Sequence, residues 1–138
     1  MRLKHLYAGW PHAGGLATGV IAGMSIAATV AISSCRNGEA SIAVPGASAD
    51  RGRQALAAIG CAACHVIPGV QGADGKVGPP LAGMGSRIMI AGQVPNTPDN
   101  LVRWIRDPQA IEPGTAMPNL SVSEQTARDI AAYLYTLQ

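Results

Sequence analysis

Large aromatic side chains are scarce in this sequence. Its 138 residues include no Phe, two Trp and three Tyr, and two of these aromatic residues, Tyr7 and Trp10, lie in an N-terminal segment that we expect to fall outside the domain. What remains is thin for the interior of a domain, and small domains commonly need a disulfide, a metal or a cofactor to be stable. The length allows one ordinary domain and little more. We therefore expect a single small domain stabilised by a bound group.

An excess of charge of one sign is also lacking. From Arg36 onward, eight Lys and Arg residues balance eight Asp and Glu residues, so the formal net charge of +2 comes from Arg2 and Lys4. Without a strong field of a single sign, nothing in the sequence indicates nucleic-acid binding.

The most informative pattern is the pentapeptide CAACH at residues 61–65. Two thiols three positions apart, followed directly by an imidazole, are typical of the attachment site of a c-type haem. The two cysteine sulfurs add to the vinyl groups of the porphyrin, and the adjacent histidine places a ring nitrogen on the iron. We therefore predict one covalent haem c, with Cys61 and Cys64 as attachment points and His65 as an axial iron ligand.

Two other roles for the two cysteines fit the sequence less well. A redox dithiol does not need the histidine that follows, and a zinc site with four ligands needs further Cys or His residues. The remaining candidates, Cys35, His5 and His12, all lie in the N-terminal apolar region. Haem attachment is therefore the favoured interpretation.

The N-terminal segment has the layout of an export signal. Residues 1–12 carry Arg2 and Lys4 without any acid, and residues 13–34 are uncharged and rich in Ala, Gly, Ile and Val. A positive flank followed by an apolar stretch is typical of export signals. The apolar stretch also has about the length of a membrane span, although its glycines weaken it as a stable anchor.

Cys35 helps to distinguish the possible fates of this segment. The sequence Ile32-Ser33-Ser34-Cys35 resembles a bacterial lipobox, which predicts acylation of Cys35. Two alternatives stay open: ordinary cleavage after Ser33 or Ala43 with no role for Cys35, and an uncleaved membrane anchor. Each of the three outcomes places the haem domain outside the cytoplasm, in the periplasm or on the outer face of the cytoplasmic membrane, and two of them keep it on a membrane.

The chain is thus predicted to have three parts. Residues 1–35 form the export signal with lipobox or the anchor, residues 36–50 a flexible linker rich in turn-forming residues, and residues 51–138 the haem domain.

Three helices are expected in the haem domain, because three segments begin with a capping residue and carry apolar residues at helical spacing. Their expected ranges are 48–59, 97–107 and 121–137, with residues 121–124 forming a capping box. We expect the last helix to pack across the first near Gly52, since a glycine inside a helix lets another backbone approach closely.

Met117 is predicted to be the second iron ligand. It lies in a loop flanked by Gly and Pro, 52 residues after His65. A neutral thioether stabilises ferrous over ferric iron, so a His/Met pair raises the reduction potential. Met84 and Met89 are rivals, but they follow the Gly-Pro-Pro-Leu turn at residues 78–81 closely, whereas Met117 has enough intervening chain to reach the opposite face of the haem. The carbonyl of Pro79, within that turn, is the candidate acceptor for the second ring nitrogen of His65.

These features together resemble a class I cytochrome c over residues 51–138. The resemblance rests on Gly52, the CAACH motif, the turn at residues 78–81, Arg87, and Met117 with the proline after it. It implies an all-α fold in which the N- and C-terminal helices pack across each other around one covalent haem. It also implies that Pro79 accepts a hydrogen bond from the haem histidine and that Arg87 lies near a haem propionate.

Residues 85–120 are most similar to the cytochrome c domain fused to subunit II of caa-type haem-copper oxidases. A subunit II also has a binuclear copper domain upstream of the haem, with two Cys plus His and Met ligands, and this sequence has no such set. We therefore expect a free-standing relative of that domain.

The predicted function is that of a monohaem electron carrier in a membrane respiratory chain, positioned between a quinol-oxidising complex and a terminal oxidase. With both axial positions filled by protein, the iron offers no open site for catalysis, so we expect a carrier and not an enzyme. Two alternatives stay open. One is a haem protein with an open or labile sixth position that binds small ligands or acts as a peroxidase, and the other is a dedicated subunit of a larger oxidoreductase.

Overall fold

The computed structural model describes residues 41–138. The predicted export segment, Cys35 and the first part of the predicted linker lie outside this range. Across the described range, every helix is too short or too polar to cross a membrane.

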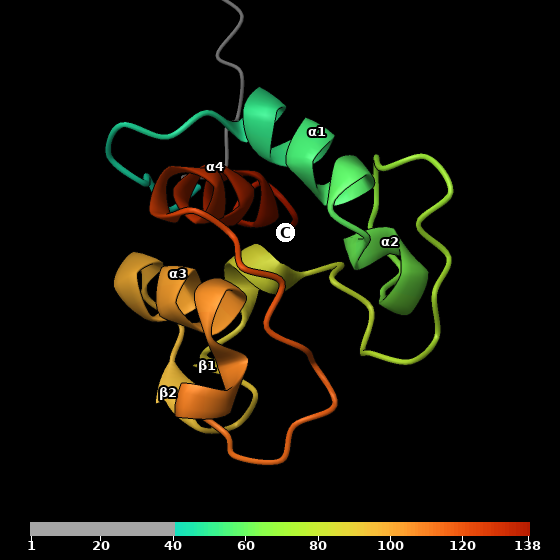
Figure 1. The fold of residues 1–138 in the computed structure, drawn as a ribbon. Helices are drawn as coiled ribbons and strands as arrows, with labels where there is room; N and C mark the ends of the chain where they lie inside the picture. The colour runs from blue at the N-terminus through green and yellow to red at the C-terminus, as the bar shows by residue number, and fades with distance from the viewer. Residues whose placement is uncertain (1–40) are drawn as a thin grey trace, which may run out of the picture. The chain divides into compact units, whose positions relative to one another are not determined.

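The described residues are mostly helical, which confirms the predicted all-α fold class (Figure 1). Two strands of two residues each form a minimal antiparallel pair, in which Met89 lies opposite Pro95 and Ile90 opposite Val94. In chain order the elements are α1 (Ala49–Ala58), α2 (Cys61–Cys64), η1 (Met84–Ser86), β1 (Met89–Ile90), β2 (Val94–Pro95), α3 (Pro98–Arg106), η2 (Pro108–Ala110) and α4 (Glu124–Leu134).

Helices α1 and α3 begin where the capping residues predict. The Ser48 hydroxyl accepts a hydrogen bond from the Arg51 backbone N–H at 3.3 Å, and the Thr97 hydroxyl accepts one from the Asn100 backbone N–H at 3.3 Å. Pro98 follows Thr97 as the first helical residue, where its missing N–H costs nothing. Local side-chain chemistry therefore sets both helix starts.

Helix α4 differs from its prediction at both ends. Its cap is Ser123, whose hydroxyl accepts from the Thr126 backbone N–H at 3.1 Å. Ser121 has a φ of 54°, whereas a helix cap needs an extended backbone, so the predicted capping box is wrong. The helix ends at Leu134, three residues before the predicted end, and the next residue, Tyr135, is fully buried.

Helices α1 and α4 cross in close contact, as the glycine in α1 predicts (Figure 1). A Cβ atom built on Gly52 would lie 1.9 Å from the carbonyl oxygen of Asp129. Only a residue without a side chain lets the two backbones come this close. The predicted packing of the last helix across the first near Gly52 is confirmed.

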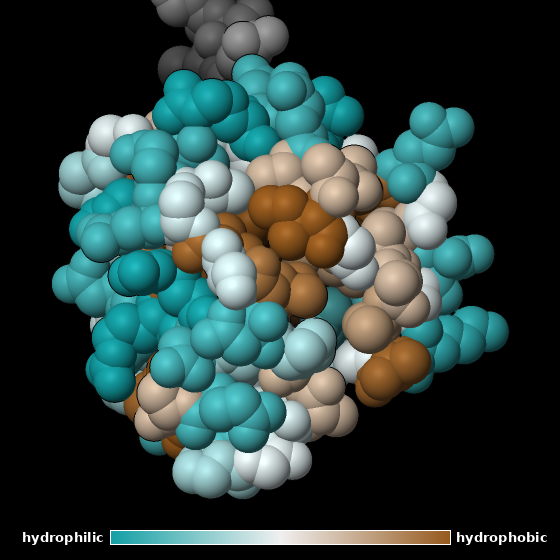
Figure 2. Space-filling view, viewed as in Figure 1, coloured by the Kyte–Doolittle hydropathy of each residue, from teal (hydrophilic) through white to brown (hydrophobic). Residues whose placement is uncertain are grey.

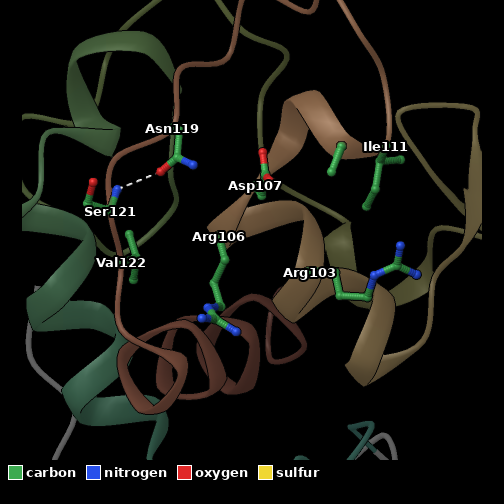
Figure 3. Close-up of a pocket in the computed structure, with 8 residues that line it drawn as sticks. Arg103, Arg106, Asp107, Ile111, Asn119, Ser121 and Val122 are labelled. Carbon is green, nitrogen blue, oxygen red and sulfur yellow. Dashed lines mark hydrogen bonds between the residues drawn. The ribbon is translucent and has the colours of Figure 1, made fainter.

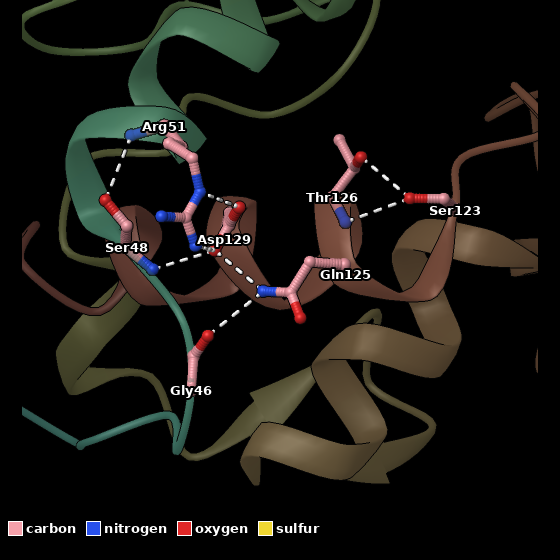
Figure 4. Close-up of polar contacts among 7 residues, drawn as sticks. All are labelled: Gly46, Ser48, Arg51, Ser123, Gln125, Thr126 and Asp129. Atoms are coloured by element: carbon pink, nitrogen blue, oxygen red, sulfur yellow. Dashed lines mark hydrogen bonds and ion pairs between the residues drawn. The ribbon is translucent and has the colours of Figure 1, made fainter.

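Asp129 joins the two helices through its buried carboxylate (Figure 4). Arg51 Nε donates to one oxygen at 2.7 Å and Arg51 Nη2 to the other at 2.9 Å. The Ser48 backbone N–H and Gln125 Nε2 donate to the second oxygen, at 2.7 Å and 3.1 Å. The hydrogen bonds from Arg51, above all, lower the pKa of the Asp129 carboxyl below its ordinary value. A buried charge is thus fully paired.

The last residues of the predicted linker lie against the domain. Val44 is buried in the core, and Gln125 Nε2 donates to the Gly46 carbonyl at 3.1 Å. The chain is therefore held by α4 before α1 begins. The boundary at residue 51 stays a prediction.

One hydrophobic core joins α1, α3 and α4. Four apolar residues of α4, Ala127, Ile130, Ala131 and Leu134, are buried, while Leu137, beyond the end of the helix, is only half-buried. The core residues that α1, α3 and α4 contribute are Leu56, Leu101, Val102, Ile105, Ala127, Ile130, Ala131 and Leu134.

Candidate functional site

An apolar cavity of about 320 Å³ lies between α2, η1, α3, α4 and the loop of residues 111–120. Figure 2 shows apolar side chains gathered in the middle of this face of the molecule. Core residues, among them Leu56, Leu101 and Ile130, also form part of the cavity wall. The wall further includes every site residue that the sequence analysis names within the described range: Cys61, Cys64, His65, Pro79, Arg87 and Met117.

The two thiols come from α2, a single turn that directly follows α1. Gly60 joins the two helices with a φ of 93°, a left-handed conformation that redirects the chain. Both thiols are free and half-buried, and burial raises the pKa of the Cys61 thiol.

His65 follows α2 in an extended conformation, and its ring is oriented by a backbone carbonyl. Its Nδ1 atom lies 2.8 Å from the carbonyl oxygen of Pro79. Because a carbonyl oxygen can only accept, the Nδ1–H is the donor in this hydrogen bond, and Nε2 is the ring nitrogen left to bind a metal.

Gly78 makes room for this ring. A Cβ atom on Gly78 would lie 2.3 Å from Cε1 and 2.9 Å from Nε2 of His65. The Gly78 backbone N–H also donates to the Cys64 carbonyl at 2.8 Å, which binds the turn to the end of α2. The sequence places the turn near the histidine, but the contact between Gly78 and the ring became visible only in the structure.

Three methionines line the cavity. Met84 is 4% exposed, Met89 is 40% exposed, and Met117 is half-buried in the loop of residues 111–120. The structure thus brings both rivals and the predicted ligand to the same cavity, and the choice of Met117 stays a prediction.

Arg87 braces the segment between the Gly-Pro-Pro-Leu turn and β1. Its guanidinium donates to the carbonyls of Pro80 and Ala82, the latter at 3.2 Å. It also lines the cavity, and a contact with a haem propionate stays a prediction.

Asn96 ties this segment to the C-terminal end of the domain, a role that the sequence analysis missed. Its Nδ2 donates to the carbonyls of Met84 and Arg87, both at 2.9 Å, and its Oδ1 accepts from the Tyr135 hydroxyl at 3.0 Å. Burial raises the pKa of Tyr135 to about 12, so this hydroxyl keeps its proton. No local sequence pattern marks Asn96, because its partners are brought together by the fold.

A second, more open hollow of about 570 Å³ lies between α3, η2 and residues 119–122 (Figure 3). The side chains of Arg103 and Arg106 on its wall point apart, and Arg106 Nη1 lies 3.6 Å from a carboxylate oxygen of Glu124. The two guanidinium groups therefore do not converge on a ligand. Among residues 41–138, no three His, Cys, Asp or Glu side chains gather in a group that could hold a metal ion.

The residues of the apolar cavity fit a covalently attached haem. Two free thiols lie on one turn, an oriented imidazole follows them, a glycine accommodates the ring, and the remaining wall is apolar with thioethers in it. These features define a domain of the c-type haem class.

The family model for cytochrome c matches residues 49–138, so the chain belongs to the cytochrome c family. Members of this family carry a covalent haem and typically act as electron carriers outside the cytoplasm.

Relatives named cytochrome c oxidase subunit 2 confirm the resemblance seen in the sequence. The protein from Alkalihalophilus pseudofirmus is 37% identical over 91 residues, which are 65% of this chain and 26% of the relative. Those from Bacillus sp. (strain PS3) and Bacillus subtilis are 30% and 33% identical, over 56% and 57% of this chain and 23% and 24% of theirs. The chain thus spans about a quarter of the length of these relatives.

Proposed function

We propose that this chain is a monohaem electron carrier, in which Cys61 and Cys64 hold the haem and His65 and Met117 are the iron ligands. The hydrogen bond of 2.8 Å between His65 and Pro79, in the wall of the cavity that also includes Met117, is the observation that carries the proposal. When bound, the haem supplies an iron that cycles between ferrous and ferric states.

The histidine side of the cavity prepares the imidazole for this role. The Pro79 carbonyl accepts a hydrogen bond from Nδ1, which orients the ring and leaves Nε2 as the nitrogen that would bind the iron. Gly78 lets the ring lie flat against the turn, so the ring has little freedom to rotate.

Met117 is the preferred second ligand because of where its loop lies. Figure 1 shows that the loop of residues 111–120, in orange, is a separate segment from α2, in green, and from the loop of residues 66–80, in yellow-green. Met84 belongs to η1, which follows the histidine-side turn closely, and its side chain is packed in the core. Met89 is paired with Pro95 at the start of β1. The separate loop could therefore supply a second iron ligand that does not belong to the histidine-side segment.

Exposed apolar side chains at the cavity provide a place for electrons to enter and leave. Val77 is 72% exposed and Met89 40% exposed, and both line the cavity, while Ile88 beside Met89 is 84% exposed. Small apolar contact areas suit the brief encounters of redox proteins.

A terminal oxidase is the proposed electron acceptor. The similarity to relatives named cytochrome c oxidase subunit 2 supports this choice. A quinol-oxidising complex as the donor rests on family analogy.

Substitution of Met117 tests the ligand assignment. Met117→Ala should lower the reduction potential by roughly 0.2 V, because axial ligands are a main determinant of haem potential, and should let the ferrous protein bind carbon monoxide quickly. The matched variants Met84→Ala and Met89→Ala should do neither. If Met84→Ala opened the iron and Met117→Ala did not, the assignment would be wrong. If the unaltered protein bound carbon monoxide quickly, the alternative of an open sixth position would replace that of a carrier.

Membrane attachment through an acylated Cys35 is part of the same proposal, although Cys35 lies outside the described residues. The mass of the mature protein should show haem, cleavage before Cys35 and an added lipid. Cys35→Ser should release the protein from membranes into the soluble fraction. Continued attachment of that variant would contradict lipidation and favour an uncleaved helical anchor.

A further inference from the structure

The loop that carries Met117 has few hydrogen bonds of its own. Among the residues that the structure describes, residues 113–120 make one backbone–backbone hydrogen bond, from the Thr115 N–H to the Glu112 carbonyl at 3.1 Å. The Met117 N–H reaches only the Thr115 hydroxyl, at 3.4 Å. Pro113 and Pro118 have no N–H to donate. The shape of the loop must therefore be maintained from outside it.

A single side chain supplies most of the missing contacts. Gln109 Oε1 accepts from the Gly114 N–H at 2.9 Å, and Gln109 Nε2 donates to the Thr115 carbonyl at 2.7 Å and to the Met117 carbonyl at 3.3 Å. Both the oxygen and the nitrogen of the amide form hydrogen bonds, and all three backbone partners lie between Gly114 and Met117. The contact includes the backbone of Met117 itself.

The turn that carries Gln109 is anchored in the core. It lies in η2, which follows α3 directly, and the preceding Pro108 is fully buried. The Ile111 N–H donates to the Pro108 carbonyl at 3.1 Å. The amide thus connects a turn anchored in the core to a loop with little support of its own.

We propose that Gln109 is a positioning residue that keeps the Met117 thioether at the haem iron. The proposal rests on the proposed ligation of the iron by Met117. Gln109 acts through the loop backbone: its three hydrogen bonds fix the carbonyl of Met117 and the turn before it, and the thioether is held where the loop places it. Without these hydrogen bonds, the thioether should compete less well with other ligands for the iron.

Binding of free imidazole to the ferric, haem-loaded protein measures this competition. Gln109→Ala should bind imidazole about tenfold more tightly than the unaltered protein, because it loses three hydrogen bonds of modest net strength. Its far-red thioether–iron absorption should weaken in parallel. Gln109→Glu still accepts from Gly114 but cannot donate, so it should also bind imidazole more tightly. Gln71→Ala is the matched control, since Gln71 is an exposed loop glutamine without a side-chain hydrogen bond to any described residue.

Met117→Ala separates failure of this proposal from failure of the proposed ligation. If the unaltered protein bound imidazole as tightly as Met117→Ala does, the ligation itself would be wrong. If those two proteins differed and Gln109→Ala stayed within twofold of the unaltered protein, the role of Gln109 would be overturned. A lower unfolding midpoint with unchanged imidazole affinity would likewise show a merely structural residue. Gln109→Glu carries the test should Gln109→Ala not fold.

Discussion

The two sides of the cavity are held in place in different ways. On the histidine side, backbone groups bind one another: the Gly78 N–H donates to Cys64, the Leu81 N–H to Val66 and the Gly75 N–H to Ala62, at 2.8 Å, 2.9 Å and 3.3 Å. On the methionine side, one exposed glutamine side chain, that of Gln109, binds the backbone of Gly114, Thr115 and Met117. The imidazole is thus fixed redundantly, whereas the thioether depends on few contacts. We therefore expect ligand exchange at the iron to occur on the methionine side.

The largest effect is expected from crowding the histidine side. Gly78→Ala would place a methyl group 2.3 Å from Cε1 of His65, which is a steric clash. The ring must then tilt away and lose its hydrogen bond to the Pro79 carbonyl. Overpacking of this kind typically costs about 1–3 kcal/mol, and we expect the free energy of unfolding of the haem-loaded protein to fall by about 3 kcal/mol. Chemical denaturation followed by haem absorbance measures it.

Gly72→Ala provides the matched control for Gly78→Ala. Gly72 has a φ of 72°, and apart from its own chain neighbours no atom lies within 4 Å of a built Cβ, so its substitution introduces backbone strain without crowding. That strain costs about 1 kcal/mol and should leave the haem spectrum unchanged. Equal losses of stability and equal spectra in the two variants would contradict a specific role for Gly78 in seating the ring.

A smaller effect is expected at the crossing of α1 and α4, which supports both sides of the cavity alike. The folded chain lowers the pKa of Asp129, chiefly through Arg51. Its carboxylate therefore stabilises the fold fully above the unfolded pKa of about 3.9, and this contribution is lost as the pH falls through the folded value. Asp129→Asn should lower the free energy of unfolding by about 2 kcal/mol at neutral pH, and the difference should shrink towards pH 3.

The comparison at each pH isolates Asp129, because other acids, Glu124 included, are common to both proteins. Asp74→Asn is the control: Asp74 is exposed and its side chain makes no hydrogen bond to any described residue. A difference between Asp129→Asn and the unaltered protein that stayed constant from pH 7 to pH 3 would contradict the assignment. Ligand exchange at the iron should not distinguish these variants.

The features that the sequence predicts well depend on adjacent residues. The attachment motif is five contiguous residues, and the starts of α1 and α3 follow from a capping hydroxyl and the amide three residues later. Gly52 also indicated the crossing of two helices, because a glycine within a helix costs stability unless close packing requires it.

The remaining features depend on partners that are distant in sequence or on competition between similar signals. Two serines, Ser121 and Ser123, could each cap α4, and the left-handed backbone at Ser121 decided in favour of the second. The contacts of Asn96 with Tyr135 and of Asp129 with Arg51 span 39 and 78 residues. In the sequence, Gln109 cannot be distinguished from other exposed polar residues, because its backbone partners come close to it only when the loop folds.

Leu56, Leu101 and Ile130 pack in the core and also line the cavity, so the interior of the domain and the seat of its cofactor share the same side chains. A haem bound there stabilises the contacts that hold α1, α3 and α4 together, since any group that binds only the folded chain adds to its stability. Copies that have completed maturation should resist proteases better than those that have not, and cellular abundance of this protein should follow the supply of haem.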